Sequence, residues 1–493
     1  MENLGRKLLC LPKNKDKKKH TTKKRVVKEY VENATAHGIT KIYLSRQIFA
    51  RLFWIAAFLT FFGFAVFQIV ELSEKLTTFD YVTKIQVNVN QNGLKFPAVT
   101  LCNSNAFLSS EVDKILEINT GNITNITSQE IMKIFQEQAV KFNKSELKKM
   151  GQQPEVFFQA GTCLFNGKNC SYPTDFYMLT SPSVGNCFTF NENGSVLQPK
   201  LGIKHGLFLV VNIDQNNYNI HDPESIFTPA GVHITIHNPG QSTHLKSHSI
   251  LAAPNQLTRI AVKKFEESRL KNPYRDNCTD NGVPGMKLLY PGGYSVPSCS
   301  ATCYVLKMSQ KCGAVDLESA LLGSQQQHLN LTLATTKEEA ECIQAFDDSF
   351  NNGSVYCDCP VLCQSTSFVT TVSTADWPSR KEMNLWRTKI GAENFTSMNF
   401  TENFLALQIY YEDFSVLTTI HQPAYDSTQF FSDLGGQLGL WIGGSFFSLL
   451  EFGVALAELI YIIVFPNNKN KKNEKEISQD KEKDSYSMSN PHA

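Results

Sequence analysis

Two long apolar stretches near the ends of the chain enclose a long segment in which apolar and polar residues are mixed. The first covers residues 52–70. The second covers 433–465, and its apolar part runs from Leu438 to Phe465. A helix rises about 1.5 Å per residue and a bilayer core is about 30 Å thick, so helices of this length span a membrane. The pattern therefore predicts two transmembrane helices with a domain of residues 71–432 between them.

The charges that flank the two stretches indicate their orientation. Basic residues are concentrated in 13–28, before the first stretch, and in 469–475, after the second. Cytoplasmic loops carry the excess of Lys and Arg, so we expect cytoplasmic tails at 1–51 and 466–493 that contact anionic lipid headgroups. The first stretch begins too far into the chain to be a removed signal peptide and lacks a small-residue cleavage site. The segment 71–432 is then extracellular.

The second stretch differs from a plain membrane anchor because it contains acidic residues and glycines. Glu451 and Glu458 are two helical turns apart and so share a helix face. A carboxylate at the bilayer centre costs about 2.5–3.5 kcal/mol, so it persists mainly where it faces water or a partner. Gly443, Gly444 and Ser445 leave room for close backbone approach or for carbonyl contact with an ion. We interpret the stretch as the wall of a cation pore. Glycines that serve helix packing and a protonated, structural Glu are the alternatives.

The segment between the stretches has the periodicity of a mixed α+β domain. Apolar and polar residues alternate as in half-buried strands in 79–103, 185–191, 206–213, 231–237 and 404–411. Helical spacing of apolar residues occurs in 109–150, and Trp377-Pro378 interrupts the later part. We therefore expect a sheet-rich core with added helices.

Composition and motifs exclude two classes of function. The formal net charge of +1 over 493 residues lacks the broad basic excess of a nucleic-acid-binding protein. The sequence has no Gly-x-Ser-x-Gly, no His-Glu-x-x-His and no phosphate-binding loop after a strand, so we do not expect an enzyme. His233 and His237 have strand spacing, but no nearby cluster of Cys or carboxylates completes a metal site. We expect neither a metal nor a cofactor.

Cysteines and glycosylation sequons are concentrated in the middle segment. Twelve of the thirteen cysteines lie there: Cys102, Cys163, Cys170, Cys187, Cys278, Cys299, Cys303, Cys312, Cys342, Cys357, Cys359 and Cys363. The sequons begin at Asn122, Asn125, Asn143, Asn169, Asn193, Asn277, Asn330, Asn352, Asn394 and Asn399. Zinc binding is the alternative for dense cysteines, but the even number and the extracellular location favour disulfides. Asn33-Ala-Thr35 is on the cytoplasmic side and is expected to stay unmodified.

Several motifs together resemble those of the degenerin/epithelial sodium channel superfamily, which includes acid-sensing and peptide-gated channels. They are His37-Gly38, Phe96-Pro-Ala-Val-Thr-Leu-Cys-Asn103, Gly185-Asn-Cys-Phe-Thr-Phe-Asn191, Cys299-x3-Cys303, Cys357-x-Cys-Pro-x2-Cys363, Trp377-Pro378, Leu434-Gly-Gly-Gln-Leu-Gly-Leu and Gly443-Gly-Ser445. The resemblance extends over almost the whole chain and omits only the tails.

The resemblance implies a trimer whose second spans line a sodium-preferring pore that amiloride blocks. The implied extracellular domain is hand-like, with a palm, β-ball, finger, thumb and knuckle. By the same resemblance, Gly443, Gly444 and Ser445 form the selectivity filter, and Gly439 is the amiloride-sensitive position. Asp433, Gly439, Glu451 and Glu458 are expected to line the pore. His37, Gly38 and Ser432 are expected to take part in gating.

The family pattern also implies a set of disulfides. The pairs are Cys102–Cys187, Cys163–Cys170, Cys278–Cys363, Cys299–Cys359, Cys303–Cys357 and Cys312–Cys342. The family often has Cys-Gly-Cys where this chain has Cys312-Gly313-Ala314, and the partner of the missing cysteine is also absent. A second departure is Asp80-Tyr81, which replaces the histidine pair of acid-sensing members. Because His titrates near neutral pH, its absence argues against gating by protons.

We therefore expect a sodium-permeable, amiloride-sensitive cation channel subunit in the plasma membrane, opened by an extracellular ligand such as a neuropeptide. The partners are related subunits in a homo- or heterotrimer, and calcium is a second candidate permeant ion. One alternative is a proton-gated or constitutively open member of the same family. Others are an ATP-gated trimeric channel, against which the Gly-x-Ser motif argues, and a membrane-anchored receptor.

Overall fold

The computed structural model describes residues 22–35, 38–120, 144–159, 161–181, 184–218, 229–241, 249–289, 292–325, 331–393 and 395–464. The chain divides into two compact units. The helical unit combines the two ends of the chain, Met1–Asp80 and Pro423–Ala493. The cysteine-rich unit is Tyr81–Gln422 and contains all six disulfides that the structure shows.

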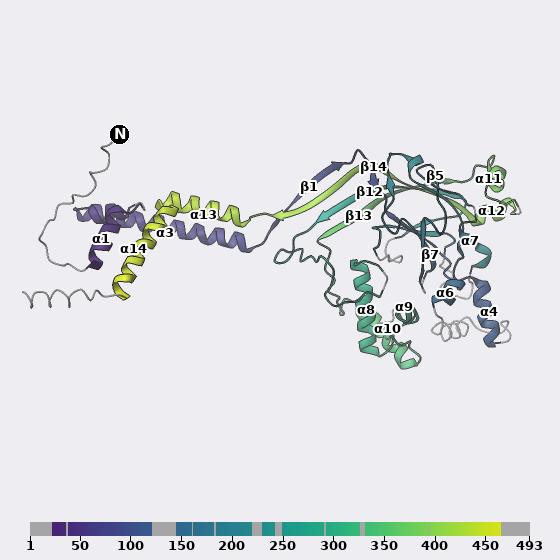
Figure 1. Cartoon of the computed structure of the whole chain (residues 1–493). Coiled ribbons are helices and arrows are strands. Elements are labelled where there is room, and N and C mark those ends of the chain that lie inside the picture. Colours follow the sequence, from purple (N-terminus) through teal and green to yellow (C-terminus); the bar gives the residue numbers. More distant parts are fainter. Residues whose placement is uncertain are drawn as a thin grey trace, which may run out of the picture. The chain divides into compact units, whose positions relative to one another are not determined.

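Both predicted membrane stretches lie in the helical unit. Its helices are α1 (Thr22–Asn33), α2 (Ile39–Leu44), α3 (Ile48–Thr77), α13 (Ser427–Ile442) and α14 (Phe446–Val464) (Figure 1). Among the described residues, α3 is long and apolar enough to cross a membrane by itself. The helices α13 and α14 meet the same test only as a pair, and they are bent by 74° at the break between them.

The stretch predicted as the second transmembrane helix, residues 433–465, is divided between α13 and α14. Helix α13 already begins at Ser427, where the Asp426 side chain accepts a hydrogen bond from the Gln429 amide in a capping box. The helix ends at Ile442, and α14 begins only at Phe446. Apolar composition predicts where the chain can cross a membrane, but it does not predict that the helical hydrogen bonds are interrupted inside the crossing.

Helices α3 and α13 lie side by side (Figure 1), and Trp441 is at their contact. Its ring stacks near those of Phe61 and Phe64, with centroid distances of 5.9 and 5.4 Å. The indole Nε1 donates to the side-chain oxygens of Gln68 at 2.7 Å and Gln437 at 2.9 Å. In an apolar medium an unpaired N–H is costly, so this shared bond stabilises the helix pair.

The cysteine-rich unit is built on two larger sheets. The first has the order β13 (Gln364–Asp376), β12 (Gln256–Ser268), β14 (Phe404–Pro423), β9 (Leu207–Asn212), β4 (Cys163–Phe165) and β5 (Lys168–Asn169), and β1 (Tyr81–Val89) also pairs with β14. The second has the order β11 (Ile250–Ala252), β10 (Val232–His237), β3 (Ala98–Asn103), β7 (Gly185–Phe190) and β6 (Phe176–Ser181). A short pair joins β2 (Leu94–Lys95) and β8 (Leu197–Gln198). The strands predicted from alternation are confirmed, and β12 and β14 are parallel.

Aromatic side chains fill the core of this unit. Phe96, Phe157, Phe188, Phe190 and Tyr411 are almost fully buried in one cluster. They come from both larger sheets and from the segments between the strands. The alternation of apolar and polar residues that predicted the strands therefore places one side of each sheet in a shared interior.

The cysteine-rich unit also contains helices. They are α4 (Ser109–Thr120), α6 (Lys144–Met150), α7 (Pro154–Phe157), α8 (Val296–Cys312), α9 (Leu317–Gln325), α10 (Lys337–Asn351), α11 (Met383–Lys389), α12 (Ser397–Asn403) and two short 3-10 turns, Ile203–His205 and Gln215–Asn217. The predicted helical region 109–150 is helical at both ends, and its middle lies outside the described residues.

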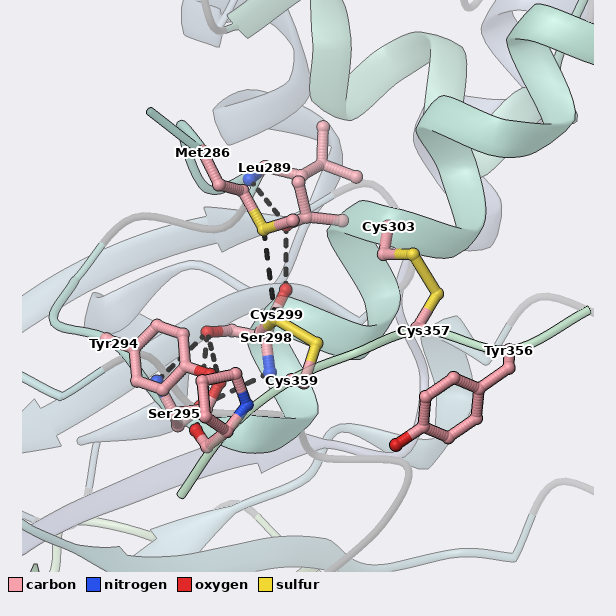
Figure 2. The surroundings of a disulfide bond; sticks show 12 residues. Met286, Leu289, Tyr294, Ser295, Ser298, Cys299, Cys303, Tyr356, Cys357 and Cys359 are labelled. Atoms are coloured by element: carbon pink, nitrogen blue, oxygen red, sulfur yellow. Dashed lines mark hydrogen bonds between the residues drawn. A yellow bond between two sulfur atoms is a disulfide. The ribbon is translucent and has the colours of Figure 1, made fainter. Parts of the chain in front are cut away.

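Disulfides join the helices and strands of this unit. The pairs are Cys102–Cys187, Cys163–Cys170, Cys278–Cys363, Cys299–Cys359, Cys303–Cys357 and Cys312–Cys342, the same six that the family resemblance implies. Two of them fix α8 to the segment 357–359 (Figure 2). The start of α8 is held by a capping box of Ser295 and Ser298, and Thr302 accepts a hydrogen bond from the Leu289 amide at 2.9 Å. The bridges thus attach a well-capped helix to its neighbours.

Candidate ion pathway and its surroundings

The break in the second span is built by glycine. Gly443 ends α13 in the left-handed backbone region, with φ of 65°. Its amide donates to the Gly439 carbonyl at 3.2 Å, and the Gly444 amide donates to the Leu438 carbonyl at 2.9 Å. These bonds satisfy the last carbonyls of the helix, and glycine is favoured there because it has no Cβ. Irregular backbone inside a membrane is tolerated where protein covers it or where it lines water.

Ser445 begins α14 as its capping residue. The Ser445 hydroxyl oxygen accepts a hydrogen bond from the Ser448 amide at 3.2 Å, which is the usual role of serine before a helix. The Ser445 amide in turn donates to the Ser448 hydroxyl oxygen at 3.2 Å. The predicted filter residues 443–445 therefore end one helix and begin the next.

Glu451 contacts the segment that precedes the first span. Its Oε2 atom accepts hydrogen bonds from the Thr35 amide at 3.3 Å and from the Thr35 hydroxyl at 3.0 Å. The Thr35 hydroxyl also lies 2.6 Å from that of Ser448. Glu458, on the same face of α14, is exposed. The sequence predicts that the carboxylates of Glu451 and Glu458 share a helix face. It does not predict that Thr35 donates hydrogen bonds to Glu451.

Asp433 and Ser432 lie in α13, within its first two turns. The Tyr425 hydroxyl donates to Asp433 Oδ2 at 2.8 Å, and the Lys75 ammonium lies 4.5 Å from the centre of the Tyr425 ring. Burial and the nearby Asp433 carboxylate raise the pKa of the Tyr425 hydroxyl to about 12. Tyr425 therefore remains a neutral donor that orients Asp433, and no motif in the sequence indicated this pair.

The predicted gating motif is described only in part. His37 lies outside the described residues, whereas Gly38 precedes α2 and its carbonyl accepts the Ile42 amide at 2.9 Å. Gly38 lines an apolar cavity of about 420 Å³ together with side chains of α3 and α13, including Trp54 and Phe58. A Cβ added to Gly38 would lie 3.6 Å from the Phe58 ring.

A histidine that the motifs did not single out lies between acidic groups in the cysteine-rich unit. The His421 ring stacks on Tyr81, with centroids 4.4 Å apart and planes at 15°. Its Nδ1 lies 2.5 Å from Asp276 Oδ2, and its Nε2 lies 3.9 Å from Glu267 Oε1. Arg269 donates to the other oxygen of Glu267. Tyr81 belongs to the Asp80-Tyr81 pair, which replaces the histidine pair of acid-sensing members. An imidazole therefore does lie next to this pair, but it belongs to His421 of strand β14 and not to β1.

Hydrogen bonding to His421 affects Asp276. Burial by itself raises the pKa of the Asp276 carboxyl, but the hydrogen bonds that it accepts from His421 and from the Leu270 amide outweigh burial and lower the pKa below its ordinary value. Asp276 is therefore a carboxylate at neutral pH, and it accepts a hydrogen from Nδ1 of His421. The opposite side of the ring then points its Nε2 atom toward Glu267.

The two histidines of strand β10 each have a hydrogen-bond partner within the protein. The described residues contain no group of three or more His, Cys, Asp or Glu side chains that could hold a metal. His237 Nδ1 lies 2.8 Å from the Asn238 carbonyl and must donate to it, so Nε2 accepts the hydrogen of the Thr100 hydroxyl at 2.8 Å. Burial lowers the pKa of His237 to about 4. This histidine is a neutral part of the sheet.

The sequon asparagines that the structure describes are all exposed. They are Asn169, Asn193, Asn277, Asn352 and Asn399. The other predicted acceptors, Asn122, Asn125, Asn143, Asn330 and Asn394, lie outside the described residues. Exposure is what glycan attachment requires, and modification of these sites stays a prediction.

Comparison with known proteins identifies the class of the molecule as an ion channel rather than an enzyme. The chain belongs to the amiloride-sensitive sodium channel family, whose family model matches residues 30–454. Its relatives are degenerins, epithelial sodium channel subunits and bile acid-sensitive channels, so the resemblance to the degenerin/epithelial sodium channel superfamily is confirmed.

Three relatives show the range of similarity. The human bile acid-sensitive ion channel is 26% identical over 462 residues, which cover 90% of this chain and 88% of that protein. Degenerin unc-8 of Caenorhabditis elegans is 30% identical over 62% of this chain, and epithelial sodium channel subunit beta of Xenopus laevis is 28% identical over 62%. The chain spans only 39% and 47% of the length of these two proteins. A proton-activated chloride channel structure covers 83% of this chain and 97% of its own at 7% identity, but its TM-score of 0.30 is too low to establish a shared fold.

Proposed function

We propose that this chain is a subunit of a sodium-permeable, amiloride-sensitive cation channel of the plasma membrane, with three subunits around one pore and both tails in the cytoplasm. The observation that carries the proposal is the second span, which is broken at Gly443–Ser445 and bears Glu451 just beyond the break. The names of the relatives support the same class of function. The middle unit would be the hand-like extracellular domain, and the partner subunits are either identical or related chains.

Each predicted pore residue receives a role in this proposal. Gly443, Gly444 and Ser445 form the filter, because the irregular backbone there presents groups that do not belong to the helical ladder. Gly439 is the position at which amiloride acts. Glu451 and Glu458 attract cations, so their charge sets the relation between sodium and calcium permeation.

Asp433 and the gating residues complete the assignment. Asp433 lines the outer end of the pore with its carboxylate oriented by Tyr425. Ser432, in the adjacent position, is a small side chain whose enlargement holds the pore open, and His37 with Gly38 takes part in gating near the cytoplasmic mouth. These roles are carried over from the family resemblance, residue by residue.

Expression in oocytes, alone and together with related subunits, tests the pore. We expect an amiloride-blocked sodium current, and we expect Glu451→Ala to change its conductance or block. Glu341→Ala is the matched control, because Glu341 is an exposed residue of α10. Its ion pair with Lys337 is also exposed and contributes little to the stability of the fold. Absence of any cation current, even with a bulky residue at Ser432, would reject the channel. Unchanged conduction in Glu451→Ala would remove Glu451 from the pore wall, whereas an anchored receptor would give no current in any variant.

The proposed stimulus is an extracellular ligand such as a neuropeptide. Its support is the Asp80-Tyr81 pair, which stands where acid-sensing relatives have two histidines. A panel of peptides applied to the expressed channel tests this proposal, and a current evoked by ATP instead would favour the ATP-gated alternative.

His421 gives a specific reason to keep proton gating as the second candidate. Nδ1 of the His421 ring carries a proton toward Asp276, so a second ring proton would place an N–H donor on Nε2, which faces Glu267 Oε1 at 3.9 Å. An acid step on the wild type, on His421→Gln and on His205→Gln tests this candidate. His205 is the control because it lies 2.7 Å from an Asn166 side-chain oxygen and not from a carboxylate. A response that is lost only in His421→Gln supports proton gating. No response in the wild type rejects it.

A further inference from the structure

A polar cavity of about 410 Å³ lies in the cysteine-rich unit, where three separate segments of the chain meet. They are the turn after β10, the residues that precede α8 and the start of β13. Amides and hydroxyls dominate the lining: Asn238, Gln241, Asn281, Gln364, Ser365 and Thr366. Such groups both donate and accept hydrogen bonds, so the cavity suits an uncharged ligand rich in hydroxyls. Asp280 also lines it, and its carboxylate is paired with the Lys271 ammonium at 2.5 Å.

Hydrogen bonds join the three segments around the cavity. The Gly293 amide donates to the Gly240 carbonyl at 2.7 Å, which connects the residues before α8 to the turn after β10. The Asn238 side-chain amide donates to the Thr366 carbonyl at 2.7 Å, which connects the same turn to β13. Tyr294, another lining residue, directly precedes the capping residue of α8 (Figure 2). The walls are therefore fixed by the protein itself.

The loop between β7 and β8 reaches the rim of this cavity and bears the sequon that begins at Asn193. A Cβ added to Gly194 would lie 3.1 Å from the Cβ atom of Pro239, so the loop backbone contacts a lining residue. The Glu192 carboxylate accepts a hydrogen bond from the Gly240 amide. Because residues on both sides of Asn193 contact the turn after β10, Asn193 lies at the rim.

The carboxamide of Asn193 is exposed and oriented. Its Oδ1 atom accepts hydrogen bonds from the Ser195 amide at 3.2 Å and from the Ser195 hydroxyl at 2.8 Å. The loop itself is anchored by Asn191, whose side-chain amide donates to the Phe96 carbonyl at 2.6 Å and whose Oδ1 accepts the Val196 amide at 3.0 Å. The sequon therefore holds Oδ1 and leaves the Nδ2 atom, to which a sugar is attached, on the other side of the carboxamide.

We propose that Asn193 carries an N-linked glycan whose first N-acetylglucosamine units occupy the polar cavity. The hydroxyl and acetamido groups of these sugars match the amides and hydroxyls of the lining. The docked sugar then joins the turn after β10, the residues before α8 and the start of β13. This inference rests on the extracellular location of the unit in the proposed function, because N-glycans are attached to extracellular segments.

Digestion of the folded, full-length protein tests the inference. The protein is produced with high-mannose glycans, and endoglycosidase H cuts between the first two N-acetylglucosamines. A docked sugar is cut only while it has left the cavity. The glycan at Asn193 should therefore be cut about tenfold more slowly in the folded protein than in the isolated glycopeptide, which is the effect of one or two hydrogen bonds. Mass spectrometry measures each site.

Three comparisons isolate the cavity. A glycan at Asn399 should be cut at similar rates in the folded protein and in its glycopeptide, because no residue of its helix α12 lines the cavity. Gln241→Ala combined with Gln364→Ala removes two lining amides and should abolish the protection at Asn193. Gln256→Ala is the matched control, because it removes an amide of β12 that does not line the cavity. Melting curves verify that each variant is folded.

The outcomes distinguish the inference from the proposed function. An unmodified Asn193 beside a modified Asn399 would overturn the inference, and so would equal cutting rates in the folded protein and the glycopeptide. Protection that persists without the amides of Gln241 and Gln364 would overturn it too. A protein with a protected glycan but no cation current would reject the proposed function and leave the inference standing. Absence of glycans at every sequon would reject the extracellular location, and the inference with it.

Discussion

Gly443 offers a sharp test of the broken second span, because its neighbour Gly444 provides a matched substitution. Gly443 has φ of 65°, and an L-residue in the left-handed region costs roughly 1–2 kcal/mol. Gly443→Ala therefore destabilises the break by about that amount in each subunit. At Gly444 an added Cβ would lie 3.4 Å from Ile442 and 3.5 Å from the Leu438 carbonyl, which are ordinary distances. Gly444→Ala lacks the backbone cost.

The magnitude determines what an experiment will detect. A cost of roughly 1–2 kcal/mol lowers the population of the native break by a factor of about 5–30 relative to competing backbone arrangements. Asn tolerates the left-handed region better than other non-glycine residues, so Gly443→Asn should lose less than Gly443→Ala. The expected order of remaining function is wild type, then Gly444→Ala, then Gly443→Asn, and last Gly443→Ala.

The assay is sodium current normalised to surface protein, together with the sodium-to-potassium permeability ratio. Normalisation separates an altered break at Gly443–Ser445 from poor delivery to the membrane. If Gly444→Ala proves as harmful as Gly443→Ala, the left-handed residue is not what makes this position sensitive. A Gly443→Ala channel with wild-type current and selectivity would likewise refute the reasoning.

Three other predictions concern stability. His237 is neutral in the folded state with a pKa of about 4, so the stability that it contributes is complete above pH 6.5 and is lost as the pH falls toward 4. At pH 5 the loss is about 2 kcal/mol, and His237→Gln should make thermal unfolding less sensitive to acid. Replacing Cys312 and Cys342 by Ala opens a bridge between residues 30 positions apart, which lowers stability by about 3–4 kcal/mol, measured as the melting temperature with and without reductant. Trp441→Phe keeps an aromatic ring but removes the Nε1–H donor, so it should lower the free energy of unfolding by roughly 1 kcal/mol, measured as a lower melting temperature in detergent. An unchanged melting curve in any of the three would contradict the corresponding contact.

Local periodicity was sufficient to predict most of the elements. Apolar spacing predicts the strands β3, β7, β9 and β10 and the helix α3. The reason is that the order of apolar and polar residues within a short segment reflects which of its faces are apolar. The end of α13 at Gly443 is different. The sequence shows glycines there, but whether a glycine packs a helix or ends it depends on its backbone angles, which composition does not determine.

The contacts between distant segments needed the structure. Thr35 and Glu451 are 416 positions apart, and neither belongs to a motif that predicts the other. His421 lies 145 positions from Asp276 and comes from a strand with no unusual pattern. Only the family resemblance predicts the disulfide pairs. Twelve cysteines permit many pairings, and their spacing selects none of them.

The four bridges between Cys278 and Cys363 are nested, and this arrangement has a consequence for proteolysis. A protease that cuts any one peptide bond in this interval leaves two fragments that are still joined covalently by at least one bridge. The nicked protein would migrate as an intact chain in a gel until a thiol is added. Damage to an exposed turn there therefore need not release any part of the molecule.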